Sequence, residues 1–176
     1  MPDRVARGAL LAAGLVLQLP PTPAAAAATA GFYTVPGCRA YDTRGPDAPS
    51  IHAWGVGAQP ERTIVVAGKC GVPAGATAVV LNVTAVSPNG PGFLTVFPAD
   101  DSFPGTYTVG FRGPDNPILR GVGPPRAGNV VVGLSGDPVV ESDPPAGAFK
   151  VFASMGGCSQ GCFVHLVVDV TGYFDD

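Results

Sequence analysis

The chain has 176 residues, of which 25 are glycine and 20 are proline. A Gly and Pro fraction this high is typical of disordered chains, but a composition of 46% hydrophobic and 13% charged residues with a net charge of −3 is not. The glycines and prolines therefore indicate turns between short apolar segments, which excludes long helices, coiled coils and collagen. Ten basic residues against 13 acidic ones give no electrostatic footprint for nucleic acid, so we expect no nucleic-acid partner.

The first thirty residues have the pattern of a secretory signal peptide. Arg4 and Arg7 precede an apolar stretch at 9–19, and prolines and small residues then lead to Ala-Thr-Ala at 28–30. As a helix the apolar stretch would span about 16 Å, half of a bilayer core. We therefore predict a cleaved signal at 1–30, a single domain at 31–176 without a transmembrane segment, and a secreted protein that is extracellular or in the cell envelope.

Four cysteines agree with export, because an even number in an exported chain indicates disulfide bonds. They are Cys38, Cys70, Cys158 and Cys162. Of the three possible pairings we favour Cys38–Cys70 with Cys158–Cys162, since the second pair flanks a tight turn between apolar segments. The spacings do not fit the paired cysteine knuckles of a zinc site.

The remainder of the chain reads as short strands bounded by Gly, Pro, Asn or Asp. The expected strands are 63–67, 76–86, 93–97, 107–112, 129–134, 139–141, 148–153 and 163–174. No segment after residue 30 has a helical period. This pattern predicts an all-β fold, a single antiparallel β-sandwich of jelly-roll or immunoglobulin-like type with eight to ten disulfide-stabilised strands. Residues 113–127 have no strand pattern and are expected to form a long Pro/Gly-rich loop.

Alternation assigns the faces of two strands. Positions 79, 81, 83 and 85 are all apolar, as are positions 164, 166, 168 and 170. Side chains two residues apart share one face of a strand, so we expect both sets to face the core. Both strands are too apolar for an edge, and we place them in the centre of the sandwich.

Five ordered motifs resemble a bacterial β-domain family. The segments at 36–44 (PGCRAYDTR), 70–76 (CGVPAGA), 78–84 (AVVLNVT), 92–98 (GFLTVFP) and 165–174 (HLVVDVTGYF) are similar to the conserved pattern of a domain common in secreted proteins of actinobacteria and myxobacteria. The similarity is weakest at residues 99–127. This resemblance implies an exported β-domain with an accessory role beside hydrolase or peptidase domains, and it supplies no active site.

Two groups of residues are candidates for ligand binding. Asp42 and Arg44 could offer a carboxylate with a guanidinium fork to a ligand, or they could anchor the N-terminal segment as an Asp–Arg pair, which we favour. Trp54 and Tyr107 could form an aromatic platform for sugar rings, although for Trp54 we favour a structural role in closing the end of the core.

No catalytic constellation is recognisable in the sequence. A serine-hydrolase triad is not expected. The chain has two histidines, His52 and His165, but no serine in a G-x-S-x-G nucleophile elbow. Along an extended strand, His165 would lie about 13 Å from Asp169. We therefore predict no catalytic residue, no metal site and no cofactor. The one metal alternative is a structural calcium held by loop carboxylates of Asp100, Asp101, Asp115 and Asp143.

The sequence thus predicts a secreted, non-enzymatic β-sandwich module that binds cell-surface or extracellular polysaccharide or cell-wall glycan. One alternative is a self-associating structural or adhesive protein, since apolar strands with few charges can pack subunits into a homo-oligomer. A small secreted hydrolase is a third.

Overall fold

The computed structural model describes residues 31–45, 50–54, 59–115, 121–138, 143–157 and 161–176, with the backbone alone at 52–54. The predicted signal peptide lies outside these ranges. Within them the protein is all-β, and no helix is long and apolar enough to cross a membrane. The described strands are β1 (Gly31–Asp42), β2 (Ile51–Trp54), β3 (Glu61–Val65), β4 (Ala78–Val86), β5 (Gly92–Pro98), β6 (Val109–Phe111), β7 (Arg126–Gly133), β8 (Ala148–Met155) and β9 (Cys162–Asp175).

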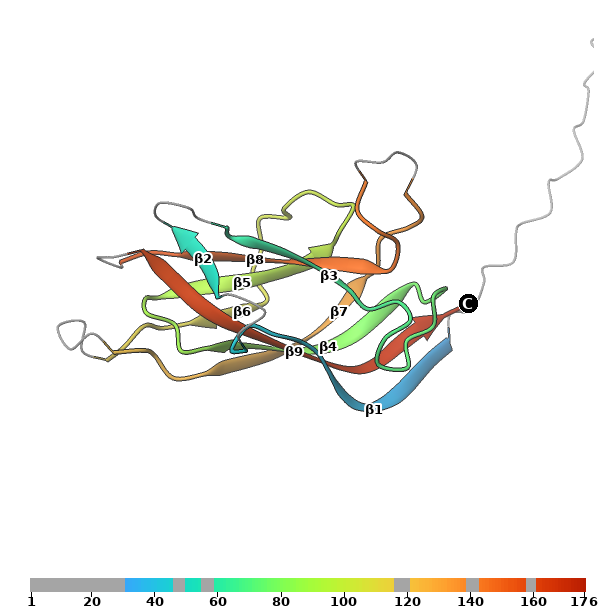
Figure 1. Cartoon of the computed structure of the whole chain (residues 1–176), viewed down its shortest axis with the longest axis horizontal. Coiled ribbons are helices and arrows are strands. Elements are labelled where there is room, and N and C mark those ends of the chain that lie inside the picture. The colour runs from blue at the N-terminus through green and yellow to red at the C-terminus, as the bar shows by residue number, and fades with distance from the viewer. Residues whose placement is uncertain (1–30, 46–49, 55–58, 116–120, 139–142, 158–160) are drawn as a thin grey trace, which may run out of the picture.

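The strands form two antiparallel sheets that face each other, which confirms the predicted sandwich (Figure 1). The first sheet has the order β1-β9-β4-β7, with β2 also paired to β9, and the second has the order β3-β8-β5-β6. β2 pairs with the first residues of β9 and also contacts β8 and β3. It therefore bridges the two sheets at one corner of the sandwich.

β4 and β9 lie at the centre of the first sheet, as their sequences predict. Both alternating sets, at 79–85 and at 164–170, are fully buried. They face Leu94, Val96 and Val151 of the second sheet in one continuous core. Burying an aliphatic side chain contributes about 1.5–3 kcal/mol, so these strands supply much of the stability of the fold.

Two strands were not expected from the sequence. β1 contains Pro36-Gly37, a pair that signals a turn, but the structure places it in an edge strand whose register shifts between Thr34 and Cys38. A bulge on an edge strand accommodates proline because no partner needs its missing N–H. β2, at 51–54, is a four-residue strand too short to show a period.

The loop predicted at 113–127 is shorter than expected, because β7 begins at Arg126. A Cβ at Gly128 would lie 2.9 Å from Val109 Cγ2, so the close approach of β6 requires a glycine inside β7. Because glycine is typical of turns, Gly128 makes the start of β7 look like part of the loop in the sequence. The expected strand at 139–141 lies outside the described residues.

The Cys38–Cys70 disulfide is formed as predicted and ties β1 to the loop that precedes β4. Cys162 is also disulfide-bonded. Cys158, its predicted partner, lies outside the described residues. The Cys38–Cys70 bond therefore connects the edge strand β1 covalently to the segment that leads into the central strand β4.

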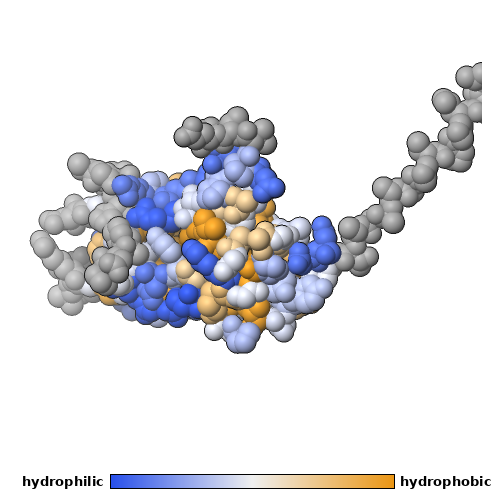
Figure 2. Space-filling view, turned by 45° about the vertical axis from the view of Figure 1, so that its right-hand side comes forward, coloured by the Kyte–Doolittle hydropathy of each residue, from blue (hydrophilic) through white to orange (hydrophobic). Residues whose placement is uncertain are grey.

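The surface is mixed in character. Figure 2 shows hydrophobic residues gathered near the middle of one view, with hydrophilic residues on both sides. Large exposed hydrophobic residues are Phe32, Tyr33, Phe103, Tyr107, Val122 and Val131. Phe103 packs against Phe97 and Phe152, so the segment after β5 covers part of the outer face of the second sheet.

Replacing both Cys38 and Cys70 by serine should lower the free energy of unfolding by about 3–4 kcal/mol. The bond spans a sequence separation of 32, and its removal restores conformational freedom to the unfolded chain. Urea denaturation of the oxidised proteins measures the difference. An unchanged midpoint would show that β1 is held without the disulfide.

Candidate functional site

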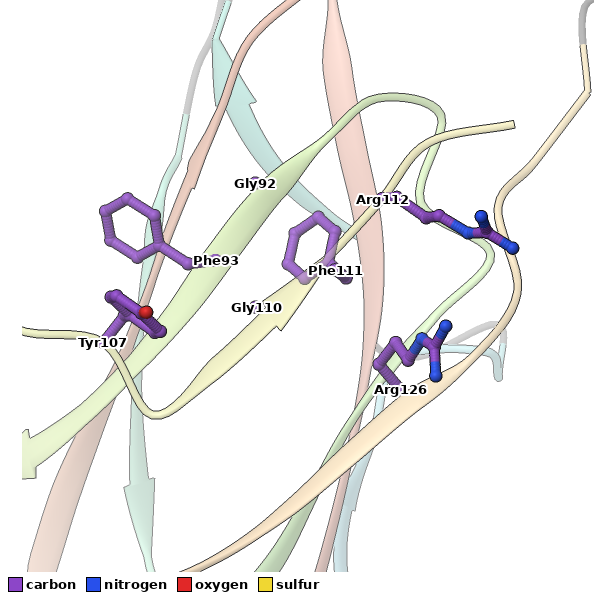
Figure 3. A pocket seen from close by; sticks show the side chains of 7 residues that line it. All are labelled: Gly92, Phe93, Tyr107, Gly110, Phe111, Arg112 and Arg126. Atoms are coloured by element: carbon purple, nitrogen blue, oxygen red, sulfur yellow. The ribbon is translucent and has the colours of Figure 1, made fainter. Parts of the chain in front are cut away.

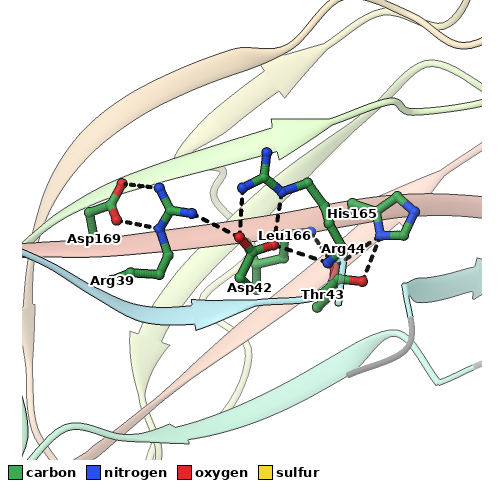
Figure 4. Close-up of polar contacts among 7 residues, drawn as sticks. All are labelled: Arg39, Asp42, Thr43, Arg44, His165, Leu166 and Asp169. Atoms are coloured by element: carbon green, nitrogen blue, oxygen red, sulfur yellow. Dashed lines mark hydrogen bonds and ion pairs between the residues drawn. The ribbon is translucent and has the colours of Figure 1, made fainter. Parts of the chain in front are cut away.

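The end of β1 carries a network of two arginines and two aspartates (Figure 4). Asp42 Oδ1 accepts hydrogen bonds from Arg44 N at 3.0 Å and Arg44 Nε at 2.9 Å. Asp42 Oδ2 accepts from Arg39 Nη1 at 2.8 Å and from Arg44 Nη2 at 2.6 Å. Arg39 Nε in turn donates to Asp169 of β9. The network therefore links the edge strand to the central strand through its side chains.

Thr43 continues this connection after β1 ends. Its backbone N–H donates to the Leu166 carbonyl at 2.9 Å, and its hydroxyl oxygen accepts from Leu166 N at 2.8 Å. His165 Nδ1 lies 2.8 Å from the Thr43 carbonyl oxygen. Thr43 is buried, so these bonds are shielded from water and fix the chain against β9.

Both oxygens of Asp42 are thus saturated by donors from its own chain. Hydrogen bonds from Arg44, first from its side chain and then from its backbone, hold the pKa of Asp42 well below its usual range, and Arg39 adds to the effect. A carboxylate with four donors has little capacity left for a ligand. The geometry favours the anchoring interpretation of Asp42 and Arg44.

Tyr107 lies in a different place, at a pocket where β5, β6 and β7 meet (Figure 3). The Tyr107 ring is tilted against that of Phe93, with centroids 5.9 Å apart. Tyr107 is 71% exposed, more than any other large hydrophobic residue in the part of the chain that the structure describes. The pocket has a volume of about 500 Å³ and is lined by Gly92, Phe93, Tyr107, Gly110, Phe111, Arg112 and Arg126.

A glycine keeps the pocket open in front of the aromatic pair. Gly110 is directly opposite Phe93 in the β5–β6 ladder. A Cβ built there would meet only Tyr107, at 4.0 Å. Any longer side chain would point outward from β6 beside the two rings, so its absence leaves the aromatic faces accessible.

Two arginines form the other side of the pocket. Figure 3 shows the guanidinium groups of Arg112 and Arg126 on one side, the rings of Phe93 and Tyr107 on the other, and Phe111 between them. Arg112 directly precedes the Pro/Gly-rich segment and Arg126 begins β7 at its end. That segment therefore begins and ends at the pocket.

The structure separates the four predicted ligand residues into distinct places. Asp42 and Arg44 lie together at the β1 edge of the first sheet, whereas Tyr107 lies near its β7 edge. The Trp54 backbone pairs with Cys162, and its side chain lies outside the described residues. Phe93, Gly110, Arg112 and Arg126 were not predicted as site residues. The one signal in the sequence was the position of both arginines at the ends of the Pro/Gly-rich segment 113–127, Arg112 just before it and Arg126 just inside it.

The carboxylates proposed as calcium ligands do not meet. Asp115 Oδ1 lies 3.4 Å from Arg112 Nη1, and Asp100 accepts a hydrogen bond from the Gly136 backbone. In the part of the chain that the structure describes, no group of three or more His, Cys, Asp or Glu side chains could hold a metal ion.

Replacing Asp42 by asparagine should destabilise the protein at neutral pH by about 1 kcal/mol and much less in acid. Because the folded pKa of Asp42 is lowered, the stability it contributes is fully present above the unfolded value of about 4 and is lost progressively as the pH falls from there through the folded pKa. Urea denaturation from pH 2 to pH 7 measures this. The control is Asp115→Asn, which removes an exposed carboxylate. An equal loss at pH 7 in both variants would contradict the anchoring role.

Comparison with known proteins gives no further assignment. We found no protein-family model, no curated protein and no solved structure that matches this chain.

Proposed function

We propose that the protein is a secreted, non-enzymatic β-sandwich module that binds cell-surface or extracellular polysaccharide at the pocket between β5, β6 and β7. The observation that carries this proposal is the exposed Tyr107 ring beside Phe93 at an open pocket. Sugar rings present flat C–H faces, and an amphipathic phenol offers both an apolar face and a hydroxyl group to such a ligand.

The size and lining of the pocket support binding. Its volume of about 500 Å³ lies in the range of small-ligand sites. The rings supply apolar area, and Tyr107 and the two arginines supply hydrogen-bond donors. Because β5 and β6 are paired strands, Phe93 and Gly110 are held in place before a ligand arrives.

The same lining supports binding without catalysis. Glycoside hydrolysis uses two carboxyl groups across the scissile bond, and no carboxylate is among the residues that line the pocket. Nor does the lining include a histidine, serine or cysteine that could act as a base or nucleophile. A module of this kind would hold a polymer while other proteins act on it.

Export is the remaining part of the proposal. The pattern of residues 1–30 supports it, and so does the Cys38–Cys70 bond, since disulfides persist in oxidising compartments. The resemblance of five motifs to a domain of secreted bacterial proteins is a third observation in favour of export. Together these three observations support the proposed accessory role at the cell surface.

Replacing Tyr107 by alanine should weaken binding to insoluble cell-wall polysaccharide by about tenfold, which corresponds to one lost aromatic contact. A pull-down with increasing polysaccharide measures the affinity. Tyr33→Ala is a matched control, because Tyr33 is half-exposed and stacks on Tyr173 away from the pocket. Equal weakening by both variants, or no binding by the wild type, would refute the proposed site.

A second variant of the same site acts by steric bulk. Gly110→Val should abolish binding because a branched side chain would fill the space beside Tyr107. It should also leave stability unchanged or raise it, since valine favours strands and would pair with Phe93 across the ladder. Binding by pull-down and thermal unfolding measure the two effects. A stable Gly110→Val protein that binds normally would contradict the proposal.

Self-association is a second candidate, favoured by an apolar stripe on the outer face of the first sheet. Val131 of β7 is directly opposite Val80 of β4, which is opposite Gly172 of β9. The Phe32 ring covers Gly172, where a Cβ would lie 2.7 Å from the ring. Val131 is 58% and Phe32 53% exposed, so this stripe could bury apolar area against a second copy.

If the stripe joins two copies, sedimentation should show a dimer that dissociates on dilution, and Val131→Asp should make the protein monomeric. A buried carboxylate at the contact would be costly to desolvate. A wild-type protein that stays monomeric at high concentration would remove this candidate.

A further inference from the structure

The pocket described above carries a local positive charge on an acidic protein. Two of the ten basic residues in a chain of net charge −3 lie side by side in its lining. Among the described residues, the only acidic side chain paired with either arginine is that of Asp115, which contacts Arg112.

The pocket arginines differ from the others that the structure describes. Arg39 and Arg44 are bonded to the carboxylates of the β1 network, and Arg62 donates to three backbone carbonyls. By contrast, the side chain of Arg126 makes no hydrogen bond or ion pair to any residue in the described ranges. Its guanidinium is available to a ligand.

Arg112 is only weakly engaged. Its Nη1 lies 3.4 Å from Asp115 Oδ1, and the two side chains are 61% and 77% exposed. An exposed pair at that distance is screened by water and contributes little. A ligand anion could therefore replace or share this contact at small cost.

We infer that the polysaccharide bound at this pocket is anionic. The inference rests on the proposed function. The sugar ring would stack on Tyr107 and Phe93, while Arg112 and Arg126 would receive a carboxylate or phosphate group on the same or the next sugar unit. A guanidinium fork matches the paired oxygens of both groups. Negative charge on the polymer is the shared chemistry, whether a uronic acid or a phosphodiester supplies it.

The experiment compares a charged oligosaccharide with its neutral ester, and adds a phosphodiester polymer as a second source of negative charge. Calorimetric titration would use oligogalacturonate, its fully methyl-esterified form, and a poly(glycerol phosphate) oligomer that carries sugar substituents. We expect at least one charged ligand to bind about tenfold more tightly than the neutral ester, because charged hydrogen bonds are the stronger ones. The preferred charged ligand identifies the source of the anion.

Arg112→Gln and Arg126→Gln should each remove most of this preference while the neutral ester still binds. The charge-matched control is Lys69→Gln, because Lys69 is exposed and precedes β4, whereas Arg126 pairs near the other end of that strand. The control should keep the wild-type preference. Circular dichroism verifies that each variant is folded.

Each other outcome has a distinct meaning. Equal affinity for charged and neutral oligosaccharides overturns the anionic specificity and leaves the proposed function intact. Absence of binding to every oligosaccharide and to insoluble cell wall refutes both. Binding of inorganic polyphosphate as tight as that of the oligomers, with no effect of Tyr107→Ala, would show a plain anion site and overturn the assignment to a sugar. Equal losses in all three charge variants would refute the two arginines as the site.

Discussion

The fold depends on the pairing of one long strand, β9, with three others. Along one side β9 pairs with β4, and along the other it pairs first with β2 and then with β1. Its alternate side chains from Val164 to Val170 are buried in the core. In the part of the chain that the structure describes, the edge segments β1 and β2 both pair with β9 alone, so their place in the first sheet depends on this strand. The Cys38–Cys70 bond and the Asp42–Arg44 network add covalent and ionic support where the pairing is interrupted by bulges.

This arrangement divides the polar motifs of the sequence into two kinds. The Asp42-Thr43-Arg44 motif makes its hydrogen bonds within the protein. Its carboxylate, hydroxyl and guanidinium groups all bond to residues of β1 or β9 or to one another. The pocket near β7 is the reverse case, because its two arginines and its tyrosine face solvent. Polar groups that are exposed and at most weakly paired, held next to packed strands, are a better basis for recognition than an equally polar but saturated cluster.

Much of the fold follows from the sequence. The alternation in β4 and β9 predicts their inward faces and their central position. Of the three possible cysteine pairings, the favoured one includes the Cys38–Cys70 bond that the structure contains. β1 was not predicted, because a bulge at Pro36-Gly37 interrupts the alternation of inward and outward side chains along the strand. The pocket could be predicted only in part. Tyr107 was a candidate as an isolated aromatic residue, but Phe93, Arg112 and Arg126 come from three strands or their ends, and only the packing of β6 against β7 brings them together.

The most direct test of the central claim is an NMR titration of the labelled protein with oligogalacturonate and its methyl ester. If the pocket between β5, β6 and β7 is the binding site, the backbone amides of Phe93, Tyr107, Gly110 and Arg126 should shift progressively, whereas those of the Asp42-Thr43-Arg44 segment should stay unchanged. Shifts centred on the β1 network, or none at the pocket while the oligosaccharide binds elsewhere, would contradict the account.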